Sequence, residues 1–135
     1  MKTKINLAFL TLFFSMLVSF SLSAQITANT QNKDKVKIDV YYFHFSARCT
    51  TCRAVESEAQ RDVKELFGDD VGFAAFNLDE KAGEAKGKEL GVNSQTLLVV
   101  KGDKKIDLTN EGFMYAVTNP DKLKKIIEAK IKPLL

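Results

Sequence analysis

Two cysteines, Cys49 and Cys52, are the residues of this 135-residue sequence whose types and spacing point most directly to chemistry. They form a Cys-x-x-Cys pair and are the only cysteines in the sequence. Two thiols at this spacing can exchange electrons with another thiol compound by making and breaking a disulfide. A purely structural bridge is the weaker interpretation, because closing so short a loop stabilises a fold by only about 2 kcal/mol in the chain-entropy model.

The segments around the pair predict that it lies between a strand and a helix. Residues 36–45 (VKIDVYYFHF) are β-branched and aromatic, and towards their end they are apolar on both faces, which predicts a central, doubly covered strand. Residues 53–67 carry apolar or small residues at helical spacing, and Gly68 follows as a cap. The N-terminus of such a helix stabilises a thiolate. We therefore expect Cys49 to be the outward-facing nucleophile and Cys52, in the first turn, to resolve the mixed disulfide.

Five neighbouring residues are candidates for supporting this chemistry. Arg48 and Arg53 flank the pair, and their positive charges would favour a thiolate. Thr50 and Thr51 lie between the cysteines, where they tune the reduction potential through hydrogen bonding and helix geometry. His44 precedes the pair on the strand, and we favour a hydrogen-bonded histidine in the sheet over a proton relay to the thiols.

The rest of the chain predicts alternating strands and helices. We expect a strand over residues 71–78, a weak helix over 79–90 that ends at Gly91, a buried strand over 96–100, a hairpin partner over 106–108, and a final helix beyond Pro120. The pattern predicts an α/β sandwich whose first connection is a right-handed parallel crossover.

The end of the chain carries two further features. The last helix is expected to turn Leu123, Ile126, Ile127, Lys130 and Ile131 inward, with its other lysines on a solvated face, and to stop at Pro133. Phe113 and Tyr115 are expected in a loop before this helix, where they either line a docking surface beside the cysteines or pack against the core.

The cysteine motif and its context resemble the thioredoxin superfamily over roughly residues 36–134. Residues 76–79, 90–92 and 95–102 follow the second half of that family in order and spacing, and residues 42–44 and 48–53 resemble small exported thioredoxin-like proteins of the ArsF type, named for a nitrophenyl-compound nitroreductase subunit. The resemblance implies a thioredoxin-like α/β fold with a central mixed sheet of about four strands flanked by helices. It also implies thiol–disulfide exchange with a dithiol or disulfide of a protein partner, in either the reducing or the oxidising direction, without an organic cofactor.

Three departures from the family pattern affect the expected site. Gln95, followed by Thr96, stands in the slot of the cis-proline that in the family faces the cysteines, presents backbone to substrates and discourages metal binding. Phe43 stands where many thioredoxins bury an acidic residue that accepts the proton of the resolving thiol. The sequence also contains no Trp, which usually precedes the cysteines. Substrate docking and proton transfer therefore need other groups.

The first 35 residues predict export. Residues 1–24 have a basic start, an apolar stretch and a small-residue exit at Ser23 and Ala24, which is typical of a removed signal peptide rather than a retained membrane anchor. Residues 25–35 are polar and predict a flexible leader, so the thioredoxin-like domain is expected over 36–135. We expect a periplasmic or secreted monomer that is not held in a membrane after signal removal. Such a compartment permits disulfides.

Composition limits the alternatives. A net charge of +3 provides no concentrated basic surplus, so we expect no nucleic-acid partner. One His and two Cys are too few for a closed zinc site, and we predict no metal ligands. The same two thiols leave open a soft-metal or metalloid binding protein, with His44 as the only imidazole, and an electron-delivering subunit of a reductase. A plain interaction module with unused cysteines is the remaining class.

Overall fold

The computed structural model describes residues 36–135. The signal peptide and the leader expected over residues 1–24 and 25–35 lie outside the described residues. Within them, four strands form one sheet: β1 (Ile38–His44), β2 (Val71–Asn77), β3 (Thr96–Lys101) and β4 (Lys104–Asp107). The spatial order is β2-β1-β3-β4. β1 runs parallel to β2 and antiparallel to β3, which confirms a mixed sheet with the predicted first strand inside it.

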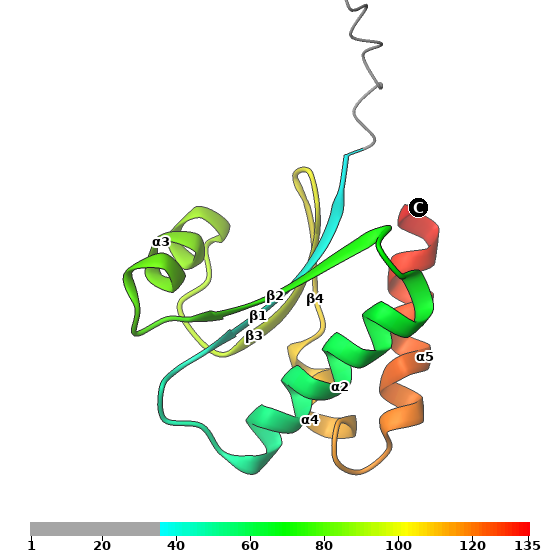
Figure 1. The fold of residues 1–135 in the computed structure, drawn as a ribbon, viewed down its shortest axis with the longest axis horizontal. Helices are drawn as coiled ribbons and strands as arrows, with labels where there is room; N and C mark the ends of the chain where they lie inside the picture. The colour runs from blue at the N-terminus through cyan, green and yellow to red at the C-terminus, as the bar shows by residue number, and fades with distance from the viewer. Residues whose placement is uncertain (1–35) are drawn as a thin grey trace, which may run out of the picture. The chain divides into compact units, whose positions relative to one another are not determined.

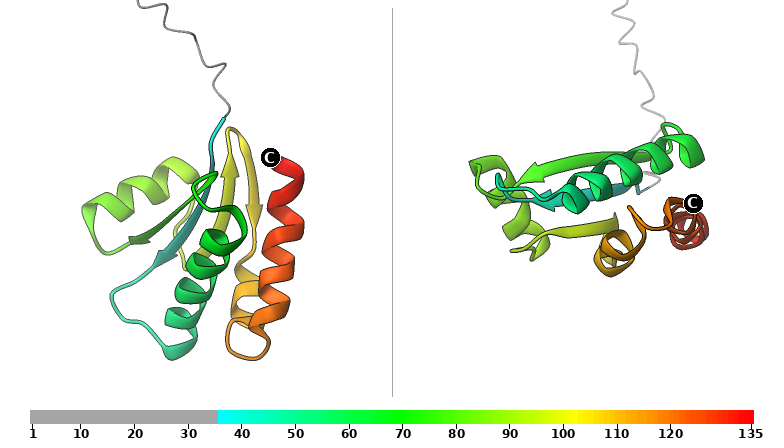
Figure 2. Two further views of the ribbon diagram at one scale, coloured as in Figure 1. Left: turned by 45° about the vertical axis from the view of Figure 1, so that its right-hand side comes forward. Right: turned by 90° about the horizontal axis from the view of Figure 1, so that it is seen from below.

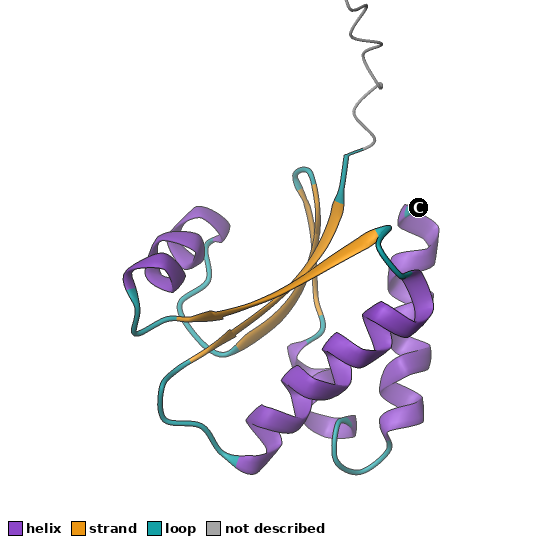
Figure 3. Ribbon diagram, in the orientation of Figure 1, coloured by secondary structure: helices purple, strands orange, loops and turns teal. Residues whose placement is uncertain are grey.

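Helices cover the two faces of this sheet unequally. Figure 1 shows α2 (Thr50–Phe67), α4 (Thr109–Tyr115) and α5 (Pro120–Ile131) on one side and α3 (Lys81–Leu90) on the other. A short 3-10 helix, Lys132–Leu134, ends the chain. Figure 3 separates the strands from the flanking helices by colour and shows the loop that joins β1 to α2.

The main core lies between the sheet and the three-helix side. Alternate residues of β1 face this side because successive side chains of a strand point to opposite faces. The buried residues come from the strands, from α2 and from α5: Ile38, Val40, Tyr42, Leu97, Val99, Val55, Ala59, Val63, Leu123, Ile127 and Ile131. Figure 2 shows α2 and α5 side by side against the sheet. This packing fixes α2, and with it the cysteines at its start.

On the opposite face, aromatic residues of β1 and β2 pack beneath α3. Phe43 is fully buried and stacks on Phe76, with ring centroids 5.7 Å apart. Lys86 of α3 lies over the ring of Tyr41, 5.1 Å from its centroid. Gly83 lets α3 approach closely, since a Cβ at this position would overlap the carbonyl oxygen of Asn77.

Three sequence expectations need correction. Helix α2 begins at Thr50 rather than Arg53, because Cys49 itself caps the helix. Phe113 and Tyr115 lie in helix α4 and not in a loop; seven residues are too few to show an apolar period, and the helix is supported by close contact of Gly112 with Val55. Lys130 is exposed rather than turned inward, because its position on α5 faces away from the sheet.

Candidate redox site at the start of helix α2

Cys49 and Cys52 form a disulfide at the start of α2, after the loop that follows β1. Their Cα atoms lie 5.2 Å apart, within the usual range for such a bond. Cys49 is exposed and occupies the N-cap position, whereas Cys52 lies in the first turn and is 3% exposed. Cys49 is therefore accessible to an incoming molecule, whereas Cys52, the other end of the same disulfide, is buried.

The start of α2 provides a positive environment for Cys49. The Cys52 amide donates a hydrogen bond to Cys49 Sγ over 3.1 Å, and the first turn of the helix contains no acidic residue. The backbone N–H groups at a helix N-terminus carry a partial positive charge, which favours an anion at the cap. This arrangement can hold Cys49 as a thiolate when the bridge is reduced.

The two flanking arginines are engaged by other groups. The Arg48 guanidinium forms an ion pair with Glu56 of α2, so a neighbouring carboxylate offsets its charge. Arg53 donates a hydrogen bond to the backbone carbonyl of Arg48 over 3.2 Å. Both arginines thus brace the loop and the first two turns of α2. Thr50 is exposed and Thr51 is half-buried within the first turn.

The strand behind the cysteines carries no acidic group at position 43. Phe43 fills its position with a buried aromatic ring. Tyr42, one residue earlier, points to the α2 side; its hydroxyl is buried and has no hydrogen-bond partner within residues 36–135. Burial raises the pKa of Tyr42, although the charge of Arg48 acts in the opposite direction, so the hydroxyl stays neutral at physiological pH.

His44 anchors the loop that leads to the pair. Its Nδ1 lies 3.0 Å from the carbonyl oxygen of Phe45, which fits the interpretation of a hydrogen-bonded histidine in the sheet. Three residues that the sequence analysis did not single out hold the same loop. Asp79 accepts a 2.7 Å hydrogen bond from the Ser46 amide, which lowers the pKa of Asp79, and Asn77 donates to the Ser46 hydroxyl over 3.0 Å. An Asn and an Asp at the end of a predicted strand were the available signal.

Gln95 contacts the buried cysteine of the pair from a separate part of the chain. It lies immediately before β3, and its Oε1 is 3.4 Å from Cys52 Sγ. Thr96, the first residue of β3, is 8% exposed and pairs in register with Phe43. No peptide bond in the described part of the chain is cis, so the bond before Gln95 is trans. Gln95 therefore presents a polar side chain to the buried sulfur.

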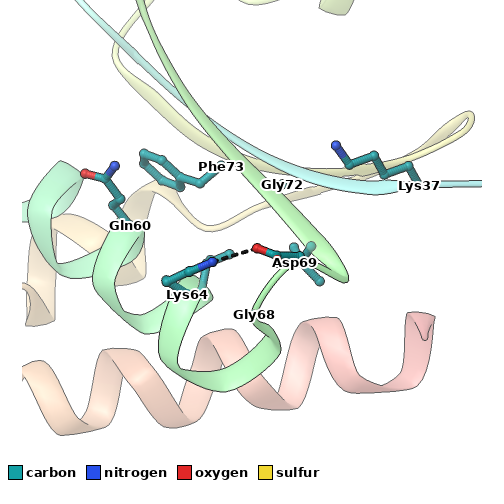
Figure 4. A pocket seen from close by; sticks show the side chains of 9 residues that line it. Lys37, Gln60, Lys64, Gly68, Asp69, Gly72 and Phe73 are labelled. Carbon is teal, nitrogen blue, oxygen red and sulfur yellow. Dashed lines mark hydrogen bonds and ion pairs between the residues drawn. The ribbon is translucent and has the colours of Figure 1, made fainter.

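In the described part of the chain, neither a cluster of metal-binding side chains nor the large cavity beside β2 extends this site. Within residues 36–135, no group of three or more His, Cys, Asp or Glu side chains is placed to hold a metal ion. A cavity of about 540 Å³ lies at the far end of α2, between that helix and the start of β2 (Figure 4). Its rim carries the Lys64–Asp69 ion pair (2.6 Å), and neither cysteine lines it. None of the helices in the described part has the length and apolarity to cross a membrane.

Comparison with solved structures identifies the architecture. The chain aligns with the crystal structure of thioredoxin O2 from Arabidopsis thaliana in its oxidised state, with a TM-score of 0.51, 22% identity, and coverage of 71% of this chain and 76% of that one. The fold is thioredoxin-like. A Fasciola hepatica thioredoxin aligns with a TM-score of 0.47 and 22% identity over 73% of this chain and 85% of its own. No protein-family model matches the sequence, and no curated protein matches it significantly.

The thioredoxin-like fold explains where the cysteine pair lies relative to the strands and helices. The mixed four-stranded sheet and its flanking helices confirm the predicted fold class, with the Cys-x-x-Cys pair at the start of a helix that follows a central strand. The finer resemblance to ArsF-type proteins stays a prediction from the sequence.

Proposed function

We propose that this protein is an exported thiol–disulfide oxidoreductase that exchanges disulfides with a protein partner. The observation that carries the proposal is the unequal exposure of the two disulfide-bonded cysteines at the N-terminus of α2. An exposed sulfur at the helix cap serves as the attacking or attacked atom, and a buried one three residues later serves as the resolving atom.

The reaction balances with the partner's thiols alone. In the reducing direction, the Cys49 thiolate attacks one sulfur of a partner disulfide, which forms a mixed disulfide and releases one partner thiolate. Cys52, after losing its proton to solvent, attacks Cys49 Sγ and releases the second partner thiolate. The chain ends with the Cys49–Cys52 bond and the partner with two thiols. The oxidising direction is the reverse, and neither direction needs an organic cofactor.

A trapping experiment tests this function. Cys52→Ser removes the resolving sulfur, so the reduced variant should accumulate a mixed disulfide between Cys49 and a protein disulfide such as that of oxidised insulin. The adduct should appear by non-reducing electrophoresis and intact mass, and it should disappear on reduction.

The matched control is Cys49→Ser, which keeps the buried sulfur and removes the exposed one. This variant should trap no partner. Equal trapping by both variants, or no adduct with either, would contradict the proposed roles of the two cysteines.

A further inference from the structure

The contact between Gln95 and Cys52 differs from the other contacts of the pair because it reaches the buried sulfur from a separate part of the chain. Gln95 Oε1 lies 3.4 Å from Cys52 Sγ, and the two residues are 43 positions apart. In the disulfide, Cys52 Sγ carries no hydrogen, so this contact is not a hydrogen bond. After reduction, the same sulfur carries an S–H group, which is a weak donor already placed against a carbonyl oxygen.

The backbone around Gln95 is fixed on both sides. Thr96 Oγ1 donates to the carbonyl oxygen of Ser94 over 3.0 Å, which closes a tight turn across Gln95. The amide of Leu97 donates to Thr109 Oγ1 over 3.0 Å, which ties the start of β3 to α4. The Gln95 side chain therefore extends from a held position.

Other candidate partners for the Cys52 thiol are turned elsewhere or lack an acceptor. Phe43 offers a hydrocarbon ring. His44 directs Nδ1 to the Phe45 carbonyl, and the Glu56 carboxylate is paired with Arg48. Among residues 36–135, the Gln95 amide is the side-chain group within hydrogen-bond reach of Cys52 Sγ.

We propose that Gln95 accepts a hydrogen bond from the Cys52 thiol in the reduced protein and thereby stabilises the dithiol relative to the disulfide. This inference rests on the proposed redox function and specifies how one side chain sets its equilibrium. Gln95 transfers no proton and contacts no substrate in this role, so it is a positioning residue. By keeping the proton on Cys52, it leaves Cys49 as the sulfur that ionises first.

The reaction with glutathione shows in which direction the loss of the Gln95 acceptor should shift the redox equilibrium. Two glutathione molecules reduce the Cys49–Cys52 bond, form one glutathione disulfide and leave two protein thiols. The hydrogen bond from the Cys52 thiol to Gln95 exists only in the dithiol. Removing the acceptor therefore destabilises the reduced state and leaves the stability of the oxidised state unchanged. The equilibrium must then shift towards the disulfide.

The experiment measures the equilibrium of the full protein with glutathione redox buffers at pH 7. Gln95→Met keeps the length of the side chain and removes its acceptor, so the equilibrium constant for reduction should fall about fivefold, which corresponds to a potential lower by about 20 mV. Gln95→Glu keeps an oxygen acceptor at the same reach, so its equilibrium constant should equal or exceed that of the unmodified protein. Gln95→Asn withdraws the acceptor by one methylene and should follow Gln95→Met, which keeps the test valid should Gln95→Met not fold.

Gln60→Met is the matched control, since Gln60 is an exposed glutamine on α2, eight residues beyond Cys52, and the hydrogen bonds of the two sulfurs do not involve it. Its equilibrium should not change. An unchanged equilibrium in both Gln95→Met and Gln95→Asn would overturn the inference. So would a decrease in Gln95→Glu as large as that in Gln95→Met, because that result means that the amide N–H donates to sulfur instead. The trapping test with Cys52→Ser lacks the Cys52 thiol, so its outcome judges the proposed function separately from the role of Gln95.

Discussion

Cys49 and Cys52 are chemically identical side chains that the fold places in different surroundings. Cys49 caps α2 and is exposed, whereas Cys52 is buried in the first turn of the helix beside Gln95. The attacking reagent in disulfide exchange must approach along the axis of the bond that it breaks, so access to one sulfur decides where exchange begins.

This difference predicts selective alkylation. In the reduced native protein at pH 7, iodoacetamide should modify Cys49 at least about tenfold faster than Cys52. The thiolate is the form that reacts, and Cys49 both occupies the N-cap position of α2 and is exposed. Peptide mapping by mass spectrometry measures the two rates. In about 6 M guanidinium the rates should become similar, and equal rates in the native protein would count against the assigned roles.

Among the helices and strands, α2 connects the redox site to the core of the fold. Its first turn carries both cysteines, its middle packs Val55 and Ala59 into the core, and its later turns meet α5, where Lys124 pairs with Glu65 (2.5 Å). The same interface contains a buried carboxyl group, Asp62, whose side chain is fully enclosed and whose Oδ2 has no hydrogen-bond partner in the described part.

Burial raises the pKa of Asp62, although the charges of Arg61 and Lys124 act to lower it and that of Glu58 adds to the increase. The folded protein therefore binds this proton more tightly than the unfolded chain does. Asp62 contributes its full stability below the pKa of an unfolded Asp, about 3.9, and that contribution is lost as pH rises through the raised folded-state pKa.

We expect Asp62→Asn to increase the free energy of unfolding by about 1 kcal/mol at pH 7, because the uncharged amide avoids the cost of a buried carboxylate. The gain should vanish near pH 3.5, where the carboxyl group is protonated in both states. Urea unfolding of both proteins at the two pH values measures the difference. Asp69→Asn is the control, since Asp69 is exposed and its hydrogen bond with Lys64 lowers its pKa; this variant should not gain stability at pH 7. A destabilised Asp62→Asn at pH 7 would contradict the argument.

In the described part of the chain, buried residues from Ile38 to Leu134 form one core cluster between the sheet and α2, α4 and α5. The C-terminus belongs to it, because Leu134 is 7% exposed and its carbonyl oxygen accepts a hydrogen bond from Lys101 of β3. The domain boundary expected near residue 36 can therefore be tested by shortening the chain at each end.

A chain that begins at residue 34 should unfold at the same urea midpoint as one that begins at residue 25. A chain that stops after Ile131 should lose about 2–4 kcal/mol of unfolding free energy, since it removes a buried leucine from the core. Circular dichroism follows both transitions. A large loss from the first truncation, or none from the second, would place the boundary elsewhere.

Local sequence patterns were enough to predict the alternation of strands and helices, the glycine caps and the position of the cysteine pair. These features follow from local periodicity and backbone preference, which neighbouring residues encode. The sequence did not reveal that Phe113 and Tyr115 are helical, because α4 is too short to show a period and is held by packing against α2.

The groups that contact the two sulfurs became known from the three-dimensional packing. The sequence marked Gln95 as a departure from the pattern of the proteins it resembles, but the contact of Gln95 with Cys52 joins residues 43 positions apart. Likewise, the pairing of Arg48 with Glu56 and the anchoring of Ser46 by Asp79 depend on side-chain direction in three dimensions. Distances between residues remote in sequence arise from the packing of the whole sheet, and no local pattern contains them.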